Sequence, residues 1–443
     1  MIQLKKRGSI AAICLSLLAA SELYAQDAKP LTLSKACEMA IANSKLLKIS
    51  QAGVEISKTG TQLAKTALSP SFDASLSGSL IGNGIITDRN FSNAKSIEMP
   101  RWGNSFALEA SQVIFAGGAI SSNIAKAKLE EQVAMLGYES NMLDICFLVT
   151  SYYLELYKLD NQSSVLRRNI EQADILIGEV KAKEQHGMAL GSDVTRHELL
   201  EKNFQIALIE VENSKKIISN QLAVTIGLPT DSKITLDPAL LEKDFSSVDY
   251  ASLIKSATEN RPELKSAAAM KEIAAKELRI AKSSFYPSIG LTAAGNTNGP
   301  ILIEVPTINK NFSYWYVGIG LRYNLASLYK SNKSIQLAKN RQRLADFNEQ
   351  LVHEQAQVAV QNAYIKFKES VEKLAVFEAS NQLANENYRI INNRYLNELV
   401  LISEMLDASN SKLSAEMQLA NAKINVIYCY YKVQREIGSK ISK

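Results

Sequence analysis

The sequence predicts a mainly α-helical chain with a small β part, built from one unit that occurs twice. Three observations predict this fold class: long proline-free stretches with helical periodicity, four short alternating segments, and identical residues repeated at fixed offsets. The chain has 443 residues, 46% hydrophobic and 21% charged, which is enough for sizeable buried cores. The formal net charge is +5, and beyond the N-terminal segment the sequence has no basic stretch, so no nucleic-acid partner is expected.

The N-terminus predicts a secretory signal peptide over residues 1–25. The basic cluster Lys5-Lys6-Arg7 precedes an apolar run over residues 10–20, and small residues surround a cleavage point near Ala25. That run is too short to span a bilayer, and no later segment has a long uncharged apolar run. The exported product is therefore expected to be soluble or to cross a membrane as β-structure.

The rest of the chain predicts two copies of one unit. Identical residues lie 217 positions apart in the first part of each copy and 211 positions apart in the second, including the pairs Asn43 and Asn260, Pro70 and Pro287, Tyr153 and Tyr364, Ser192 and Ser403, and Gly227 and Gly438. The expected organisation is a signal peptide (1–25), a first repeat (26–227), a linker (228–250), a second repeat (251–438) and a tail (439–443).

Each copy is expected to form a helix, two strands and two very long helices. The long helices are predicted from Ala119 to about Gln185 and from about Ser331 to Tyr395, neither of which contains proline. Some 65 residues at ~1.5 Å each give a helix on the order of 100 Å long, so these helices must pack along one another as coiled coils or a helical barrel.

A returning helix is expected after each long helix, over 194–226 and 404–437. Ser192 and Ser403 are the expected N-caps, because a hydroxyl can accept from the first free backbone amides. Gly187 and Gly191 suit the first turn. The second turn lacks glycine, and Asn397 is the residue expected to take its strained backbone angle.

Four segments alternate in polarity, over residues 72–80, 105–111, 288–293 and 315–323, with one apolar face and one small or polar face. This pattern is typical of a half-buried sheet, or of a transmembrane barrel with a wet interior. Strands of ~9–11 residues with aromatics near their ends favour the barrel. Expected membrane-interface aromatics include Trp102, Trp315 and Tyr323. Four strands cannot close a barrel, which needs at least eight, but three chains would supply twelve.

In this order the motifs resemble the TolC-like outer-membrane factors, the exit ducts of tripartite efflux pumps and type I secretion systems. The similarity extends from Leu31 to Gly438. Its carriers are Leu31-Thr32-Leu33, Pro70 and Pro287, Phe115-Ala116-Gly117-Gly118, Ala125-Lys126-Ala127-Lys128, Ile226-Gly227-Leu228-Pro229 and Glu404-Met405-Leu406-Asp407-Ala408.

The resemblance implies a homotrimer whose twelve-stranded β-barrel sits in outer-membrane lipid of a Gram-negative bacterium and continues as a periplasmic α-helical barrel. It implies passive conduction of cargo, a periplasmic adaptor, and an inner-membrane pump of the RND, ABC or MFS type. Multidrug efflux and type I secretion are both open, as are drug, metal and protein cargoes.

The resemblance also implies a gate at the periplasmic tip. Glu404 and Asp407 match an acidic pair lining the constriction, and Tyr395 and Asp193 match residues of interhelical locks. Val400 stands where the family's salt-bridge lock has a basic residue. The expected adaptor-contacting tips are Ala189, Leu190, Gly191, Ser192, Val400, Leu401, Ile402 and Ser403. The residues alone also fit another interpretation, in which Glu404 and Asp407 are ordinary acidic residues that the helix dipole favours at the start of a helix.

Neither an enzyme nor a cofactor or metal site is expected. The three histidines, His186, His197 and His353, have no Cys or His at metal-binding spacing, and neither a phosphate loop nor a nucleophile-elbow motif occurs. A packing or solvated role is expected for His186 and His197. Cys37, Cys146 and Cys429 are expected to be buried free thiols. The main alternative is a periplasmic coiled-coil structural or adaptor-like protein, which would leave the alternating strands unexplained.

Overall fold

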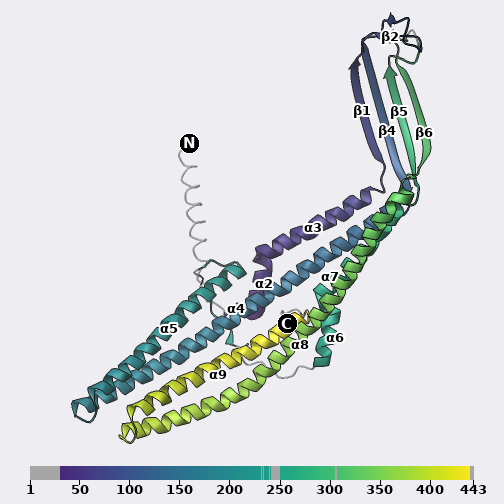
Figure 1. The fold of residues 1–443 in the computed structure, drawn as a ribbon. Helices are drawn as coiled ribbons and strands as arrows, with labels where there is room; N and C mark the ends of the chain where they lie inside the picture. Colours follow the sequence, from purple (N-terminus) through teal and green to yellow (C-terminus); the bar gives the residue numbers. More distant parts are fainter. Residues whose placement is uncertain are drawn as a thin grey trace, which may run out of the picture. The chain divides into compact units, whose positions relative to one another are not determined.

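The computed structural model describes residues 30–439 apart from 231, 233, 239, 241–249 and 305–306. The predicted signal peptide, part of the predicted linker and most of the predicted tail lie outside the described residues. The chain is mostly helical with a small sheet part, which confirms the predicted fold class (Figure 1). It forms two compact units: unit 1 comprises residues 1–48, 140–261 and 355–443, and unit 2 comprises residues 49–139 and 262–354.

Unit 2 contains a four-stranded antiparallel sheet with the strand order β1-β4-β5-β6. Its strands are β1 (Ser71–Leu80), β4 (Trp102–Ala116), β5 (Ser288–Gly299) and β6 (Phe312–Arg322). β1 and β6 have 10 and 11 residues, as predicted, whereas β5 and β4 are longer, with 12 and 15. A short hairpin that the sequence did not predict, β2 (Gly84–Ile86) and β3 (Lys95–Ile97), lies between β1 and β4 along the chain.

The strand register puts the four predicted apolar sets on one face of the sheet. Directly opposed residues of antiparallel strands point to the same face. Leu76 opposes Phe106, Ala110 opposes Ala293, and Ala293 opposes Val317. Asp73 opposes Glu109 on the other face. The predicted alternation is therefore confirmed as one continuous apolar face across all four strands.

A bulge in β4 extends this apolar face by one aromatic residue. The register between β4 and β5 shifts between Val113 and Phe115, so that Val113 opposes Gly290 and Phe115 opposes Ile289. In an unbroken strand Phe115 would share the polar face with Glu109 and Val113, because side chains alternate. The extra residue, Ile114, returns Phe115 to the apolar face beside Ile289.

Helices of unit 2 pack through a few specific polar contacts. They are most of α3 (Lys45–Thr66), α7 (Pro262–Ser283) and the first parts of the two longest helices, α4 (Ala119–Gln185) and α8 (Ser327–Leu396). Lys126 on α4 pairs with Glu277 on α7 at 2.8 Å. The Thr61 hydroxyl on α3 donates to the Ala127 carbonyl at 3.1 Å. The proline-free stretches thus form the two uninterrupted helices that were predicted.

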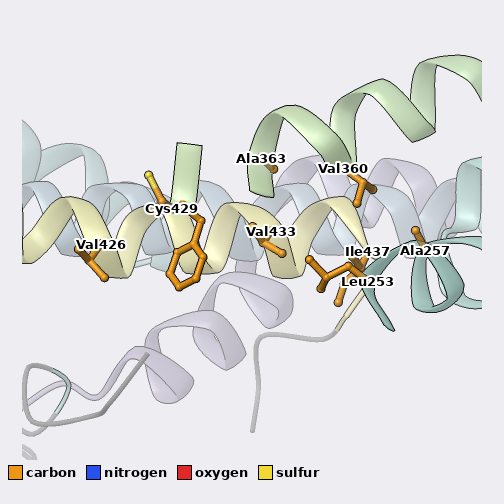
Figure 2. Packing of buried hydrophobic residues seen from close by; sticks show 9 residues of the cluster. Leu253, Ala257, Val360, Ala363, Val426, Cys429, Val433 and Ile437 are labelled. Atoms are coloured by element: carbon orange, nitrogen blue, oxygen red, sulfur yellow. The ribbon is translucent and has the colours of Figure 1, made fainter. Parts of the chain in front are cut away.

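Unit 1 contains α2 (Leu33–Asn43), α5 (Gly191–Ile226), α6 (Tyr250–Asn260), α9 (Ile402–Glu436) and the remaining parts of α4 and α8. The first predicted helix of each copy is in fact two, because the chain breaks at Ser44 and again before Pro262. Figure 2 shows one core of unit 1, where α6, α8 and α9 meet. It buries Leu253, Ala257, Val360, Ala363, Phe367, Val426, Cys429, Val433 and Ile437.

In each copy, the end of the first helix contacts the end of the last helix in the same way, and we call this contact the joint. Gly227 ends α5 with φ of 84°, and a Cβ there would lie 2.5 Å from the Cβ of Asn43. Gly438 follows α9 with φ of 73°, and a Cβ there would lie 2.9 Å from the carbonyl carbon of Asn260. Both positions require glycine for two reasons, backbone angle and close approach. The joint supports the duplication, while the exact repeat boundaries stay a prediction.

Among the described helices, none combines the length and the hydropathy that a bilayer span requires.

Candidate gate at the helical turns

The two helix-to-helix turns of unit 1 have the same backbone conformation. Gly187 after α4 has φ of 73°, and Glu398 after α8 has φ of 61°. In both turns the next amide donates at 2.9 Å to the carbonyl five residues earlier. The two positions are 211 apart, the offset of the repeat. The prediction that Asn397 would take the strained angle was wrong, since the residue equivalent to Gly187 is Glu398.

The returning helices begin earlier than predicted, so the expected serine caps are wrong. Ser192 and Ser403 lie inside the first turns of α5 and α9. At the start of α5 an acidic residue caps a free backbone amide instead, because Asp193 Oδ2 accepts from the Leu190 amide at 3.4 Å. A carboxylate at this position is also favoured by the helix dipole.

Below the turns, the hairpin α4–α5 packs against the hairpin α8–α9 through a small apolar cluster. Its buried members are Leu176, Val180, Val194 and Met405, with Ala189, Tyr388, Ile391, Tyr395 and Leu396 packed against them. Val194 and Met405 are equivalent positions of the two copies. Because both hairpins contribute, moving one hairpin away from the other would expose this cluster to water.

A histidine and a tyrosine link the two hairpins beside this cluster. His197 Nε2 lies 3.2 Å from the Tyr395 hydroxyl oxygen, and the rings meet edge to face with centroids 5.6 Å apart. His197 is only 2% exposed. Its burial lowers the pKa of His197, and the nearby Asp193 carboxylate acts in the opposite direction. Burial also raises the pKa of Tyr395. The contact is therefore one between neutral groups near pH 7.

A second polar contact ties the end of α4 to the end of α8. The Lys183 ammonium donates to the carbonyl of Leu396, the last residue of α8. A cation at a helix C-terminus satisfies a free carbonyl and complements the helix dipole. Together with the His197–Tyr395 contact, this bond holds the turn of one hairpin against the turn of the other.

The structure brings some of the predicted gate residues together and leaves others apart. Asp193 lies near Tyr395 and His197, but the hydrogen-bond partner of Tyr395 is His197, for which a packing or solvated role was predicted. Glu404 occupies the position of α9 equivalent to Asp193 on α5. Glu404 and Asp407 are exposed and make no ion pair within the described ranges. Val400 is half-buried, and contributes no charge.

The predicted tip residues differ in exposure. Leu190 is 69% exposed and Leu401 70%, at equivalent positions of the two turns. Gly191, Ser192 and Ser403 are also exposed, whereas Ala189 and Ile402 are partly covered. Each turn of this chain thus exposes one large apolar side chain, Leu190 or Leu401, at the equivalent position.

A polar seam between α4 and α9 was not predicted from the sequence. Its pairs are Gln162 with Asn421 at 2.6 Å, Asn169 with Glu416 at 3.0 Å, and Gln172 with Lys412 at 2.6 Å. Lys412 is 7% exposed, its Nζ lies 4.4 Å from the centre of the Tyr388 ring, and burial lowers its pKa. The sequence feature that could have indicated this seam is the position of Lys412, which follows Met405 and Ala408 in the heptad pattern of buried positions.

In unit 2, the predicted interface aromatics lie at opposite ends of the sheet. Trp102 is the first residue of β4, Trp315 lies near the start of β6, and Tyr323 follows the end of β6. Trp102 and Trp315 are 74% and 79% exposed. Tyr323 follows Trp315 by eight positions, which corresponds to about 26 Å along a strand. This spacing fits an apolar band of about 25 Å between two aromatic girdles.

The sheet has one apolar face with aromatic residues at its ends, and long paired helices accompany it. These features together are typical of the class of outer-membrane channels. The family model "Outer membrane efflux protein" matches residues 36–228 and 253–427, and the chain belongs to this family. It is an outer-membrane exit duct, and the match decides against the alternative of a periplasmic coiled-coil protein.

Named relatives and a solved structure agree with this assignment. The chain is 20% identical to the outer membrane efflux protein BepC of Brucella suis over 95% of this chain and 88% of BepC. It is 23% identical to Toxin and drug export protein A of Aggregatibacter actinomycetemcomitans, over 90% of this chain and 84% of that protein. Its fold matches that of the outer membrane protein VceC of Vibrio cholerae with a TM-score of 0.77 at 16% identity, covering 92% of this chain and 96% of VceC.

Proposed function

We propose that three copies of this chain form a passive duct, closed at rest by the contacts between its helical hairpins. Efflux channels of this fold trimerise and work with pumps. For this chain the proposal is a homotrimer with a twelve-stranded β-barrel in outer-membrane lipid, continued by a periplasmic barrel of α-helices.

The open sheet of unit 2 is the observation that carries this proposal. Among the described residues, its outer strands β1 and β6 each have one unpaired edge. Unpaired strand edges invite pairing with another chain. Their apolar residues are unusually exposed, for example Leu76 at 81% and Ile319 at 72%. Joining β6 of one copy to β1 of the next satisfies both edges, and twelve strands can close.

The gate proposal rests on the contacts at the helical turns. Opening requires the two hairpins of a chain to separate, which breaks the bond between His197 and Tyr395 and the bond from Lys183 to the end of α8. The Asp193 carboxylate lies near the His197–Tyr395 pair and interacts electrostatically with both residues. Glu404 and Asp407 are proposed to line the constriction, where three copies would form acidic rings that attract cations.

The exposed turn residues are the proposed docking site for a periplasmic adaptor. Leu190 and Leu401 present apolar surface at equivalent places, so six such side chains would surround the tip of a trimer. The pump would be of the RND, ABC or MFS type. Relatives with similar sequences carry names that include toxin and drug export and pyoverdine export. Multidrug efflux and type I secretion are the two proposed settings.

The test combines extraction with conductance. The protein is expected in outer-membrane vesicles, to require detergent for release, and to run as a heat-labile trimer on mild gels. In planar bilayers the trimer should conduct and prefer cations. Recovery from the soluble periplasm without detergent, or a detergent-extracted protein that never conducts, would overturn the proposed duct.

A further inference from the structure

Two of the three cysteines that follow the predicted signal peptide lie side by side in unit 1. Cys37 on α2 and Cys146 on α4 are 109 positions apart in sequence. The Cys37 thiol donates to the Cys146 carbonyl, with 3.7 Å between Sγ and O. Cys37 has no exposed surface, and Cys146 is 6% exposed. The third, Cys429 on α9, has Asn425 as its polar neighbour at 4.0 Å.

We propose that Cys37 and Cys146 are joined by a disulfide in the exported protein, which makes this pair a covalent modification site between α2 and α4. All three cysteines are buried free thiols in the structure, as the sequence predicts, but the fold brings Cys37 and Cys146 together across 109 positions. Cys37 Sγ already contacts the backbone of Cys146 at 3.7 Å, and the bond would require side-chain rotations that bring the two sulfurs to the ~2.05 Å of a disulfide. A protein of the outer membrane passes through an oxidising compartment, where such bonds form.

The reaction is a thiol–disulfide exchange with an oxidant of the disulfide class. One cysteine thiolate attacks a sulfur of the oxidant, forming a mixed disulfide and releasing a thiolate. The second cysteine, as thiolate, then attacks the mixed disulfide, forms the Cys37–Cys146 bond and releases the second oxidant thiolate. The chain loses two protons and two electrons, and the oxidant is reduced to a dithiol.

The bond is expected to form before α2 packs. In the folded chain neither sulfur is accessible to a large oxidant. The interaction between the two cysteines, together with burial, raises the pKa of Cys37, whereas the same interaction lowers the pKa of Cys146. The protonated Cys37 thiol is a poor nucleophile, and burial keeps an oxidant from the Cys146 sulfur. Folding that encloses the pair unoxidised would therefore leave it reduced, so oxidation belongs to the folding stage after export.

The surrounding contacts show what the bond would hold. The Tyr153 hydroxyl donates to the Leu31 carbonyl at 2.7 Å and accepts from the Asp237 amide at 2.9 Å. Leu31 also pairs with the segment before α6 through its amide, which donates to Thr235 at 2.7 Å. The N-terminal segment is thus bound to α4 by noncovalent contacts near the pair. A disulfide adds a covalent link and closes a long loop of the unfolded chain.

The test counts free thiols in the protein as cells make it. Outer membranes are quenched in acid, denatured without reductant and treated with a maleimide, before and after reduction. The sequence has four cysteines, of which Cys14 lies in the predicted signal peptide, so three remain. The proposal predicts one label per chain before reduction and three after, with a peptide pair containing Cys37 and Cys146 in the unreduced digest.

Matched variants identify which cysteines form the bond. Cys429→Ser should give no label before reduction and two after, and Cys37→Ser should give two labels in both cases. Reduced wild-type protein should unfold at a lower temperature than the oxidised protein, whereas Cys37→Ser should show no such shift. Three labels in wild-type protein before reduction would overturn the proposal. So would a disulfide that involves Cys429 or that links two chains on a nonreducing gel.

Discussion

Replacing Tyr395 with phenylalanine removes one hydroxyl from the proposed gate and leaves the aromatic ring in place. That hydroxyl lies 3.2 Å from His197 Nε2, and His197 is 2% exposed. A hydrogen bond of this kind contributes about 1 kcal/mol net, and a buried group left without a partner costs somewhat more. Because the bond joins α5 to α8, it is present when the hairpins are packed and absent when they separate. Tyr395→Phe should therefore favour the open state by about 1 kcal/mol per chain.

The size of the effect depends on how the three chains move. If they open independently, about 1 kcal/mol raises the open population roughly fivefold in each chain. If they open together, about 3 kcal/mol raises it by about two orders of magnitude. Single-channel recording in planar bilayers at fixed pH and voltage measures this population as open probability, and the multiplicity of conductance levels distinguishes independent from concerted opening.

The matched control is Tyr388→Phe. Tyr388 packs in the same apolar cluster, and within the described ranges its hydroxyl makes no hydrogen bond, while its ring would keep the contact with Lys412. This variant should behave like wild type. If Tyr395→Phe also matches wild type, or if both variants open equally, the His197 bond does not hold the gate and the reasoning fails.

Three further predictions concern the same turns. Burial lowers the pKa of His197 in the packed state, so the separated state binds a proton more readily. The packed state therefore keeps its full stability above about pH 6.5. It loses stability as the pH falls from about 6.5 towards the lowered pKa. Open probability should therefore rise on acidification, and His197→Gln should be insensitive to it. At the two equivalent turns, Gly187→Ala should destabilise the folded protein by about 1 kcal/mol, and Glu398→Gly should stabilise it by a similar amount. Both residues have positive φ, and a Cβ at Gly187 meets open space, so backbone strain alone sets the effect. Thermal unfolding in detergent measures both changes. The double variant Glu404→Gln and Asp407→Asn should weaken cation selectivity, read as a smaller reversal potential in a salt gradient.

Each of these has a clear contrary result. A response to acid that survives in His197→Gln would assign the titration to another group. A Gly187→Ala variant more stable than wild type, or Glu398→Gly less stable, would mean that the turn geometry differs from the one described. An unchanged reversal potential would place the narrowest part of the duct away from Glu404 and Asp407.

Elements set by local sequence were predictable. The absence of proline fixed the extents of α4 and α8 closely, and period-two alternation located all four strands of the sheet. Elements that depend on a partner were not. The bulge at Ile114 is defined by the register with β5, and nothing within β4 alone marks it. The break at Ser44 and the hairpin β2–β3 lack a strong periodic signal of their own.

The gate residues divide in the same way. Asp193 and Tyr395 were found through a family resemblance, but the partner of Tyr395 was not, since His197 lies 198 positions away in sequence. The equivalent of His197 in the second copy is Ala408, so the repeat could not indicate it either. Lys412 was detectable, because a lysine at a heptad position among buried residues calls for a partner. Cys37 and Cys146 show the same limit, since only the fold brings them together.

Native mass spectrometry of the detergent-extracted protein tests the central claim most directly. The claim is that the two free edges of a four-stranded sheet are satisfied by neighbouring copies until twelve strands close. The account predicts a particle of three mature chains that falls to single chains on heating. A particle of one, two or four chains would contradict it, because none of these supplies the twelve strands on which the proposed duct depends.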